Sequence, residues 1–186
     1  MTAVPSNMLP LGTVAPDFEL PDVVSGRQLR LASVKSDKAT VIMFICNHCP
    51  YVKHVNKGLV KLARDYQAQG VSFVAISSND VEAYPEDAPD KMQAVAAQQG
   101  YSFPYLYDAD QSVAKAYQAA CTPDFYVFDA DLRLIYRGQM DSSRPRNDMP
   151  VTGEDLRTAL DAVLAGEPVS AEQRPSLGCN IKWKES

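Results

Sequence analysis

The stretch that most constrains the fold is residues 41–50, with the sequence Val-Ile-Met-Phe-Ile-Cys-Asn-His-Cys-Pro. Five apolar residues lead directly into two cysteines that stand three positions apart, and a proline follows. A continuous apolar run of this length is typical of a strand buried on both faces, and proline suits the first turn of a helix. The stretch therefore predicts a buried strand that delivers a dithiol to the start of a helix.

The residues after Pro50 have a strong helical period, and Gly70 is a natural helix end. The apolar side chains recur at spacings of three and four residues, as on one face of a helix: Val52, Val55, Leu59, Leu62 and Tyr66. The same patterns predict further strands and helices: strands at 71–76 and 103–107, and helices at 89–99, 110–117 and 152–166. Two hairpins are expected from alternating segments around turn residues: 17–20 with 28–31, and 125–128 with 132–136.

Strands that alternate with helices predict an α/β fold: a central mixed β-sheet with helices on both faces and an antiparallel edge. The hairpin at 17–31 adds an N-terminal extension. Residues 167–186 show no helical or strand periodicity, so we expect them to form an irregular C-terminal tail. A chain of 186 residues fits a single domain, residues 1–186, with its core at about 15–166.

Charge and hydropathy exclude two classes of partner. The net charge is −5, and the basic residues stand singly or in short pairs, so a nucleic-acid-binding face is not expected. No apolar run approaches the ~20 residues that span a bilayer, and no signal peptide is recognisable, so we expect a cytoplasmic protein that binds no membrane. Four cysteines in that compartment are normally reduced. We expect no cofactor.

The dithiol itself predicts thiol–disulfide exchange. Cysteines at positions i and i+3 of a first helical turn are close enough to form a disulfide after small adjustments. The helix start stabilises a thiolate on the first of them, so we expect Cys46 to attack and Cys49 to resolve the mixed disulfide. The alternative is a pair of inert buried thiols. Between them, His48 either stabilises the Cys46 thiolate when protonated or faces solvent without a role.

The segment Cys121-Thr-Pro-Asp precedes a predicted strand, so Thr122–Pro123 is a candidate cis peptide bond, the alternative being a trans proline that starts the strand. The remaining cysteines leave more than one hypothesis open. Cys121 is a third redox thiol, a metal ligand or a small buried hydrophobic residue. Cys179 lies far along the chain but within reach of the dithiol, either as an auxiliary thiol or as a packed tail residue.

Together these motifs resemble the thioredoxin fold, and more narrowly the peroxiredoxin-like proteins of the alkyl hydroperoxide reductase/thiol-specific antioxidant superfamily. The narrower resemblance rests on Asp-Phe-Glu-Leu at 17–20, on the segments around the dithiol and Thr122–Pro123, and on Gly-Cys-Asn-Ile-Lys-Trp-Lys at 178–184. It implies that Cys46 is the nucleophile and Cys49 the resolving cysteine. Pro123, in cis and next to Thr122, would form the loop that lies against the dithiol and binds substrate backbone.

The chain departs from the peroxiredoxin pattern at three places. Cys49 matches the peroxidatic cysteine, but Ile42 and Cys46 stand where that family has proline and threonine or serine. No arginine occurs near Pro123, where the resemblance would put one. The buried acid of thioredoxins is replaced as well, by Thr40. These departures weaken the resemblance for peroxide chemistry.

The favoured hypothesis is a thiol–disulfide oxidoreductase that acts on a disulfide-containing protein or small molecule and exchanges electrons with a thiol donor that the sequence does not identify. One alternative is a thiol-dependent peroxidase with Cys49 peroxidatic and Cys46 resolving. Lesser alternatives are a redox-sensing module and a protein in which Cys46, Cys49 and either Cys121 or His48 hold zinc or copper. The direction of transfer and the oligomeric state are left open.

Overall fold

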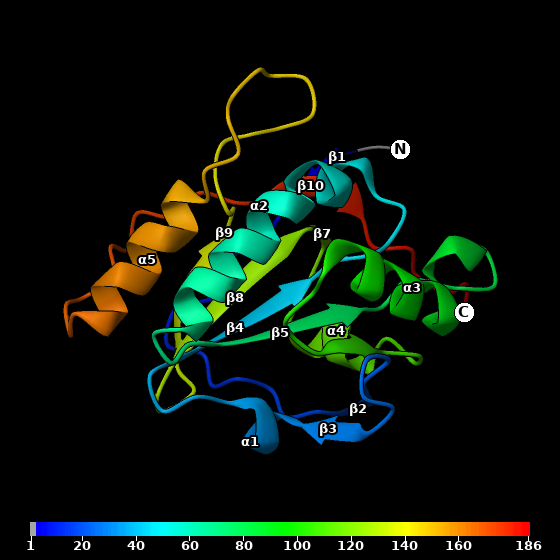
Figure 1. The fold of residues 1–186 in the computed structure, drawn as a ribbon, viewed down its shortest axis with the longest axis horizontal. Helices are drawn as coiled ribbons and strands as arrows, with labels where there is room; N and C mark the ends of the chain where they lie inside the picture. Colours follow the sequence, from blue (N-terminus) through cyan, green and yellow to red (C-terminus); the bar gives the residue numbers. More distant parts are fainter. Residues whose placement is uncertain (1–2) are drawn as a thin grey trace.

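Residues 3–186, the part of the chain that the computed structural model describes, form a central sheet of five strands in the order β6-β5-β4-β8-β9 (Figure 1). These strands are β4 (Ala39–Phe44), β5 (Ser72–Ser77), β6 (Tyr105–Tyr107), β8 (Asp124–Asp129) and β9 (Leu134–Gly138). The first three run parallel, and β8 and β9 are antiparallel to their neighbours. The predicted mixed sheet with an antiparallel edge is confirmed.

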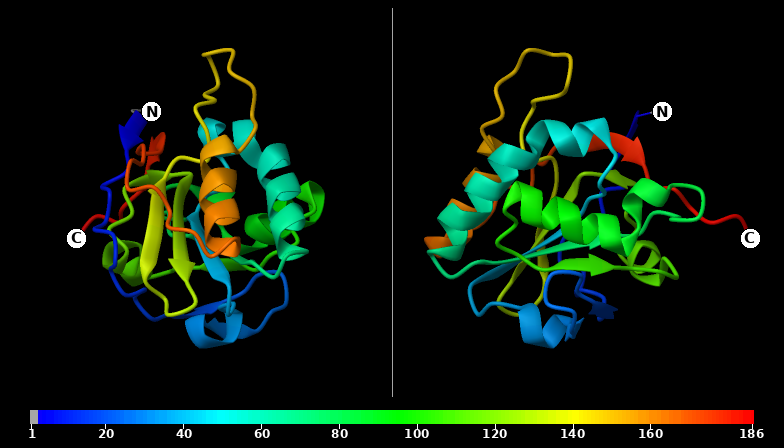
Figure 2. Two further views of the ribbon diagram at one scale, coloured as in Figure 1. Left: turned by 90° about the vertical axis from the view of Figure 1, so that its left-hand side faces the viewer. Right: turned by 45° about the vertical axis from the view of Figure 1, so that its right-hand side comes forward.

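Helices cover both faces of this sheet, as predicted (Figure 2). Three lie on one face: α2 (Pro50–Gln67), α3 (Pro89–Gln99) and α5 (Glu154–Leu164). The other face is covered by α4 (Ser112–Ala116) and by α1 (Leu31–Val34), a single turn that we did not predict. Because side chains alternate along a strand, Val41 and Met43 pack under α2, while Ile42 and Phe44 pack on the opposite face.

The N-terminal hairpin is also present. It pairs β2 (Glu19–Pro21) with β3 (Gln28–Arg30) as a separate small sheet. No helix within residues 3–186 has the length and apolar character that would let it cross a bilayer. Residues 1 and 2 of the predicted domain lie outside the described part of the chain.

The prediction of an irregular tail is wrong for part of residues 167–186. Strand β10 (Leu177–Asn180) lies between β1 (Ala3–Pro5) and β7 (Cys121–Thr122) in a second sheet at one end of the molecule (Figure 1). The strand is only four residues long, too short to show a period, and its partners lie far away in the sequence. The pairing therefore depends on the tertiary fold.

Candidate active site

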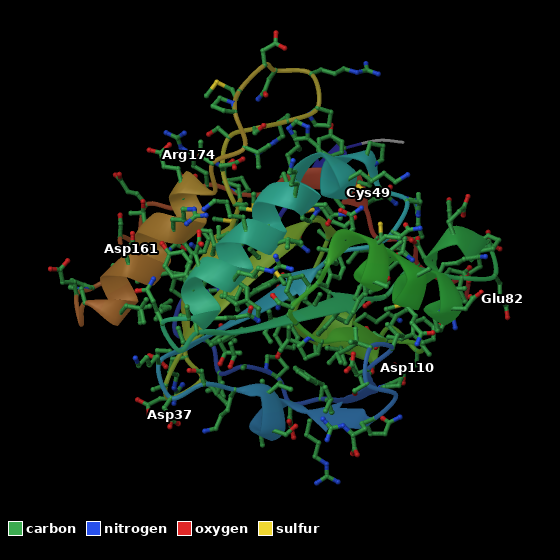
Figure 3. The ribbon with its side chains drawn as sticks, viewed as in Figure 1. Asp37, Cys49, Glu82, Asp110, Asp161 and Arg174 are labelled. Carbon is green, nitrogen blue, oxygen red and sulfur yellow. The ribbon has the colours of Figure 1, made fainter. Side chains whose placement is uncertain are left out.

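The dithiol lies where the central strand meets the first long helix. Strand β4 ends at Phe44, and Cys49 is the residue immediately before α2, so Cys49 occupies the position at the helix start (Figure 3). Cys46 lies three residues earlier, in the connecting segment, and not in the first helical turn as we expected. Both side chains are buried, with Cys46 2% and Cys49 0% exposed.

The loop between β7 and β8 packs against both sulfurs. The Thr122–Pro123 peptide bond is cis, as predicted. Thr122 contacts both cysteines, because its Oγ1 is 3.6 Å from Cys46 Sγ and its carbonyl oxygen is 3.4 Å from Cys49 Sγ. Both Thr122 and Pro123 are thus at the dithiol, although they are more than 70 positions away in the sequence.

The two other cysteines differ in their relation to the dithiol. Cys179 of β10 reaches it directly, with its Sγ 2.7 Å from Cys49 Sγ. Cys121 does not: its Sγ donates to the Pro123 carbonyl oxygen at 3.8 Å, and it makes no hydrogen bond with another cysteine of residues 3–186. Burial, together with the nearby Asp124 carboxylate, raises the pKa of the Cys121 thiol, so Cys121 stays protonated.

The pKa values of the two dithiol cysteines are shifted in opposite directions. Hydrogen bonds from Cys46 and Cys179 outweigh burial and lower the pKa of Cys49 to about 5. The pKa of Cys46 is raised well above its ordinary value by its hydrogen bond with Cys49, by burial and by the Asp87 carboxylate. We expected the thiolate on Cys46, but the helix start that stabilises an anion lies at Cys49.

Asp87 is a site residue that the sequence analysis missed. It is fully buried and comes from the short 3-10 turn η1 (Pro85–Asp87) that precedes α3. Its carboxylate accepts hydrogen bonds from the Asn47 backbone N–H at 2.8 Å, from Asn79 Nδ2 at 2.9 Å and from His48 Nδ1 at 2.5 Å. Asp87 therefore holds both residues that separate the cysteines. Nothing in the sequence distinguishes it from the other acids of its loop.

His48 is oriented by this carboxylate and does not face solvent. Its side chain is 13% exposed, and its ring stacks on Tyr84 with centroids 5.4 Å apart. Nδ1 bonds the Asp87 carboxylate. The other ring nitrogen, Nε2, is buried and has no hydrogen-bond partner within the described residues. A His–Asp pair with a free ring nitrogen is an arrangement suited to general acid–base chemistry.

One set of side chains in residues 3–186 is suited to hold a metal ion. Donor atoms of Cys46, His48 and Asp87 lie within 4.8 Å of one another, and sulfur, nitrogen and carboxylate oxygen are all zinc donors. Cys49 and Cys121, which the metal hypothesis included, are not part of this set. Binding a metal through Asp87 Oδ2 would compete with its bond to His48.

A pocket of about 520 Å³ opens beside the thiols. Its lining includes Cys179, the first residues of α2, and two basic residues of the long β9–α5 loop: Pro50, Tyr51, Arg144 and Arg146. A larger cavity of about 750 Å³ lies beside α5 and contains no cysteine. The pocket of about 520 Å³ therefore borders a site thiol, although Cys179 itself is only 2% exposed.

The model of the AhpC/TSA family matches residues 11–137. An uncharacterized conserved protein from Geobacillus kaustophilus is 65% identical, with a TM-score of 0.99 over 100% of this chain and 98% of that chain. A hypothetical protein from Sinorhizobium meliloti is 51% identical, with a TM-score of 0.95 over 98% of this chain and 99% of that chain. A putative thioredoxin from Neisseria meningitidis is 21% identical, with a TM-score of 0.63 over 84% and 93% of the two chains, and its likeness confirms a thioredoxin-like fold. No curated protein sequence matches.

Proposed function

Because the chain belongs to the AhpC/TSA family, we propose that it is a thiol–disulfide oxidoreductase that works through a mixed disulfide at Cys46. One observation carries this proposal: both sulfurs of the dithiol lie against the Thr122–Pro123 turn, at 3.6 Å and 3.4 Å from Thr122 oxygens. Two thiols that share a hydrogen bond and one negative charge are suited to exchange.

The reaction starts with a proton transfer inside the pair. Cys49 holds the charge, so it accepts the proton of Cys46 across their hydrogen bond. The Cys46 thiolate attacks one sulfur of the substrate disulfide, and the other sulfur leaves and takes the proton back from Cys49. Cys49 then attacks Cys46, the second substrate thiolate leaves, and the protein gains the Cys46–Cys49 disulfide as the substrate gains two electrons.

The substrate is a disulfide of a protein or of a small molecule. Cys46 is only 2% exposed, so it reacts after a local opening of the site or with a substrate that displaces the groups around it. A thiol electron donor returns the protein to the reduced form, and the same steps in reverse oxidise a dithiol substrate. We propose a cytoplasmic setting, where these thiols are kept reduced.

The second candidate function is peroxide reduction at Cys49. The observation that favours it is the pKa of about 5 on Cys49, since a thiolate is the form that attacks a peroxide. The Cys49 thiolate takes one oxygen, becomes a sulfenic acid and releases an alcohol or water. The Cys46 thiol then condenses with the sulfenic acid to a disulfide and releases water.

Substitution of each cysteine separates the two functions. In Cys49→Ser protein at mildly alkaline pH, thiol–disulfide exchange predicts a stable mixed disulfide at Cys46 with a model protein disulfide such as insulin. Cys46→Ser would trap none, and Cys121→Ser is the control that keeps full turnover. The result that favours peroxide reduction over thiol–disulfide exchange is peroxide consumption that persists in Cys46→Ser and is lost in Cys49→Ser. No mixed disulfide would then be trapped at Cys46.

A further inference from the structure

The contact between Cys49 and Cys179 gives the site a thiol that the dithiol mechanism does not use. We propose that Cys179 is a third redox residue, which exchanges with the Cys46–Cys49 disulfide to form a Cys49–Cys179 disulfide and release Cys46. This inference rests on the proposed function, because that function forms the first disulfide. Its substrate is the protein's own disulfide, and no outside oxidant is needed for the step.

The distance is the first support. The two sulfurs lie 2.7 Å apart and both side chains are at least 98% buried, so a shift well under 1 Å brings them to bonding distance. The neighbouring Cys121 is as deeply buried and close in space along β7, yet it makes no such contact within the described residues. Burial of a cysteine near the site is therefore not enough to explain the position of Cys179.

The second support is how firmly β10 is held there. Cys179 is paired with Thr122 on one side and with Ala3 on the other. Its neighbour Gly178 lies so close to the cis-proline turn that a Cβ would be 1.9 Å from the Thr122 carbonyl oxygen. Beyond the strand, the Lys182 N–H donates to Asn79 Oδ1 at 2.8 Å and the Asp80 N–H donates to the Lys182 carbonyl oxygen at 2.8 Å. Cys179 thus belongs to the structure that holds the site.

The third support is the effect of charge. In the reduced site, burial and the hydrogen bond to Cys49 raise the pKa of Cys179 to about 12, so its proton stays on. Once Cys49 is in a disulfide with Cys46, it carries no charge and no longer raises the pKa of Cys179. Lys182, which lowers the pKa of Cys179, then acts against burial alone. Oxidation of the dithiol therefore makes Cys179 a better nucleophile.

The step balances without an added reactant. Cys179 loses its proton and attacks Cys49, the Cys46–Cys49 bond breaks, and Cys46 leaves as a thiolate that takes up a proton. Donor atoms of Cys46 and of the half-buried His48 ring lie within 4.8 Å of one another, a separation that one water molecule bridges for this proton transfer. One disulfide replaces another, and the oxidation state of the protein does not change.

The exchange moves the disulfide to the pocket. Cys179 lines the cavity of about 520 Å³ that Arg144 and Arg146 also border, whereas Cys46 does not line it. A reducing thiol that enters this pocket attacks Cys179, and Cys49 leaves as the thiolate that the site stabilises. The two arginines favour a thiol that carries a carboxylate.

The test is disulfide mapping of the full-length protein after equilibration in glutathione redox buffer and acid quench. No lysine or arginine lies between Cys46 and Cys49, so trypsin leaves both on one peptide, and a crosslink to the Cys179 peptide is read directly by mass spectrometry. Wild-type protein is expected to give both the internal disulfide and this crosslink. Cys46→Ser protein is expected to give only the crosslink, which assigns it to Cys49.

Two variants complete the design. Cys179→Ser is expected to keep the Cys46–Cys49 disulfide and lose the crosslink, and Cys121→Ser to match wild type. The third-thiol inference alone would be overturned if neither the wild-type nor the Cys46→Ser protein formed the crosslink. The conditions must be ones in which the wild type forms the Cys46–Cys49 disulfide and reduces insulin. A crosslink in a protein that never traps a substrate at Cys46 would support the Cys49–Cys179 pairing and overturn the proposed function instead.

Discussion

The two sides of Cys49 are built in different ways. On one side, Cys46 is three positions away in the chain, and the residues between them are held by the buried carboxylate of Asp87. On the other side, Cys179 is 130 positions away and is held by backbone pairing of β10. The first side places a carboxylate and an imidazole beside the dithiol, whereas the second places a third thiol against Cys49 by strand pairing. A redox site can therefore gain a further thiol from a segment that is distant in the sequence.

The largest effect is expected from Cys49→Ser, which removes the sulfur that both sides share. Turnover of a disulfide substrate should fall on the order of 10³-fold or more, as for loss of other catalytic nucleophiles. The thiolate absorbance that titrates with a pKa of about 5 in wild type should disappear, because that charge is on Cys49. The measurement is ultraviolet absorbance against pH in reduced protein.

Cys121→Ser is the control for this titration, since the raised pKa of Cys121 keeps its thiol protonated. Cys46→Ala should move the transition to higher pH, because it removes the hydrogen bond from Cys46 that is the largest cause lowering the pKa of Cys49. A transition near the wild-type pH in Cys49→Ser protein would show that the charge lies elsewhere.

The second prediction changes only the side of Cys49 that contains Cys46 and Asp87. Asp87→Asn removes a buried carboxylate that accepts bonds from Asn47, His48 and Asn79, so we expect the free energy of unfolding to fall by about 1–3 kcal/mol in urea. The Asp87 charge raises the pKa of Cys46, so alkylation of Cys46 should begin at lower pH in the variant. The Cys49–Cys179 crosslink should remain.

Glu86→Gln is the matched control, because Glu86 is the exposed acid next to Asp87. Its substitution should change the free energy of unfolding by less than about 0.5 kcal/mol. Equal effects of the two substitutions would mean that Asp87 acts only through the general charge of its loop.

The third prediction changes only the side of Cys49 that contains Cys179 and β10. Gly178→Ala places a Cβ 1.9 Å from the Thr122 carbonyl oxygen. Because this oxygen belongs to the backbone, the clash is relieved only if β10 moves away from Thr122. We expect a loss of about 1–3 kcal/mol in stability and at least a tenfold smaller Cys49–Cys179 crosslink, while the Cys46–Cys49 disulfide still forms. Quantitative peptide mapping measures both disulfides in one sample.

Asn180→Ala, on the same strand, is the comparison for this change, because Asn180 is exposed and its truncation adds no atoms. It should leave the crosslink at the wild-type level. An unchanged crosslink in Gly178→Ala protein would show that the close approach of β10 to Thr122 does not set the distance between the sulfurs.

The smallest effect concerns a buried acid that serves neither side. Burial outweighs the hydrogen bonds from Ser6 and Tyr126 and raises the pKa of Asp124 to about 7. A carboxyl group with a raised folded-state pKa contributes stability that is full below its ordinary pKa and is lost as pH rises through about 7. Between about pH 5 and about pH 8, the Tm of wild type should therefore fall by about 5 °C more than that of Asp124→Asn.

Asp131→Asn, at an exposed turn position, controls for the general change in charge and should follow wild type. Thermal unfolding of the three reduced proteins at several pH values gives the comparison. Parallel curves for wild type and Asp124→Asn would mean that Asp124 remains ionised across this range.

Much of the fold could be predicted from short-range patterns. The period of residues 50–67 predicted α2, and the alternating segments predicted both hairpins and the antiparallel edge. Thr122–Pro123 was predicted as a cis bond from its place before a strand. Asp87 and β10 were missed, because one is an acid among other acids and the other is a four-residue strand without a local signal.

The sequence by itself determined that a buried strand leads into a dithiol and then into a helix, because apolar spacing and the position of Pro50 are properties of neighbouring residues. Only the tertiary structure decided that the pKa of Cys49 is lowered while that of Cys46 is raised, that Asp87 holds the connecting residues and that Cys179 contacts Cys49. The reason is physical: burial, hydrogen bonds and charge depend on which distant segments pack together, and strand pairing over 130 positions leaves no period in the chain.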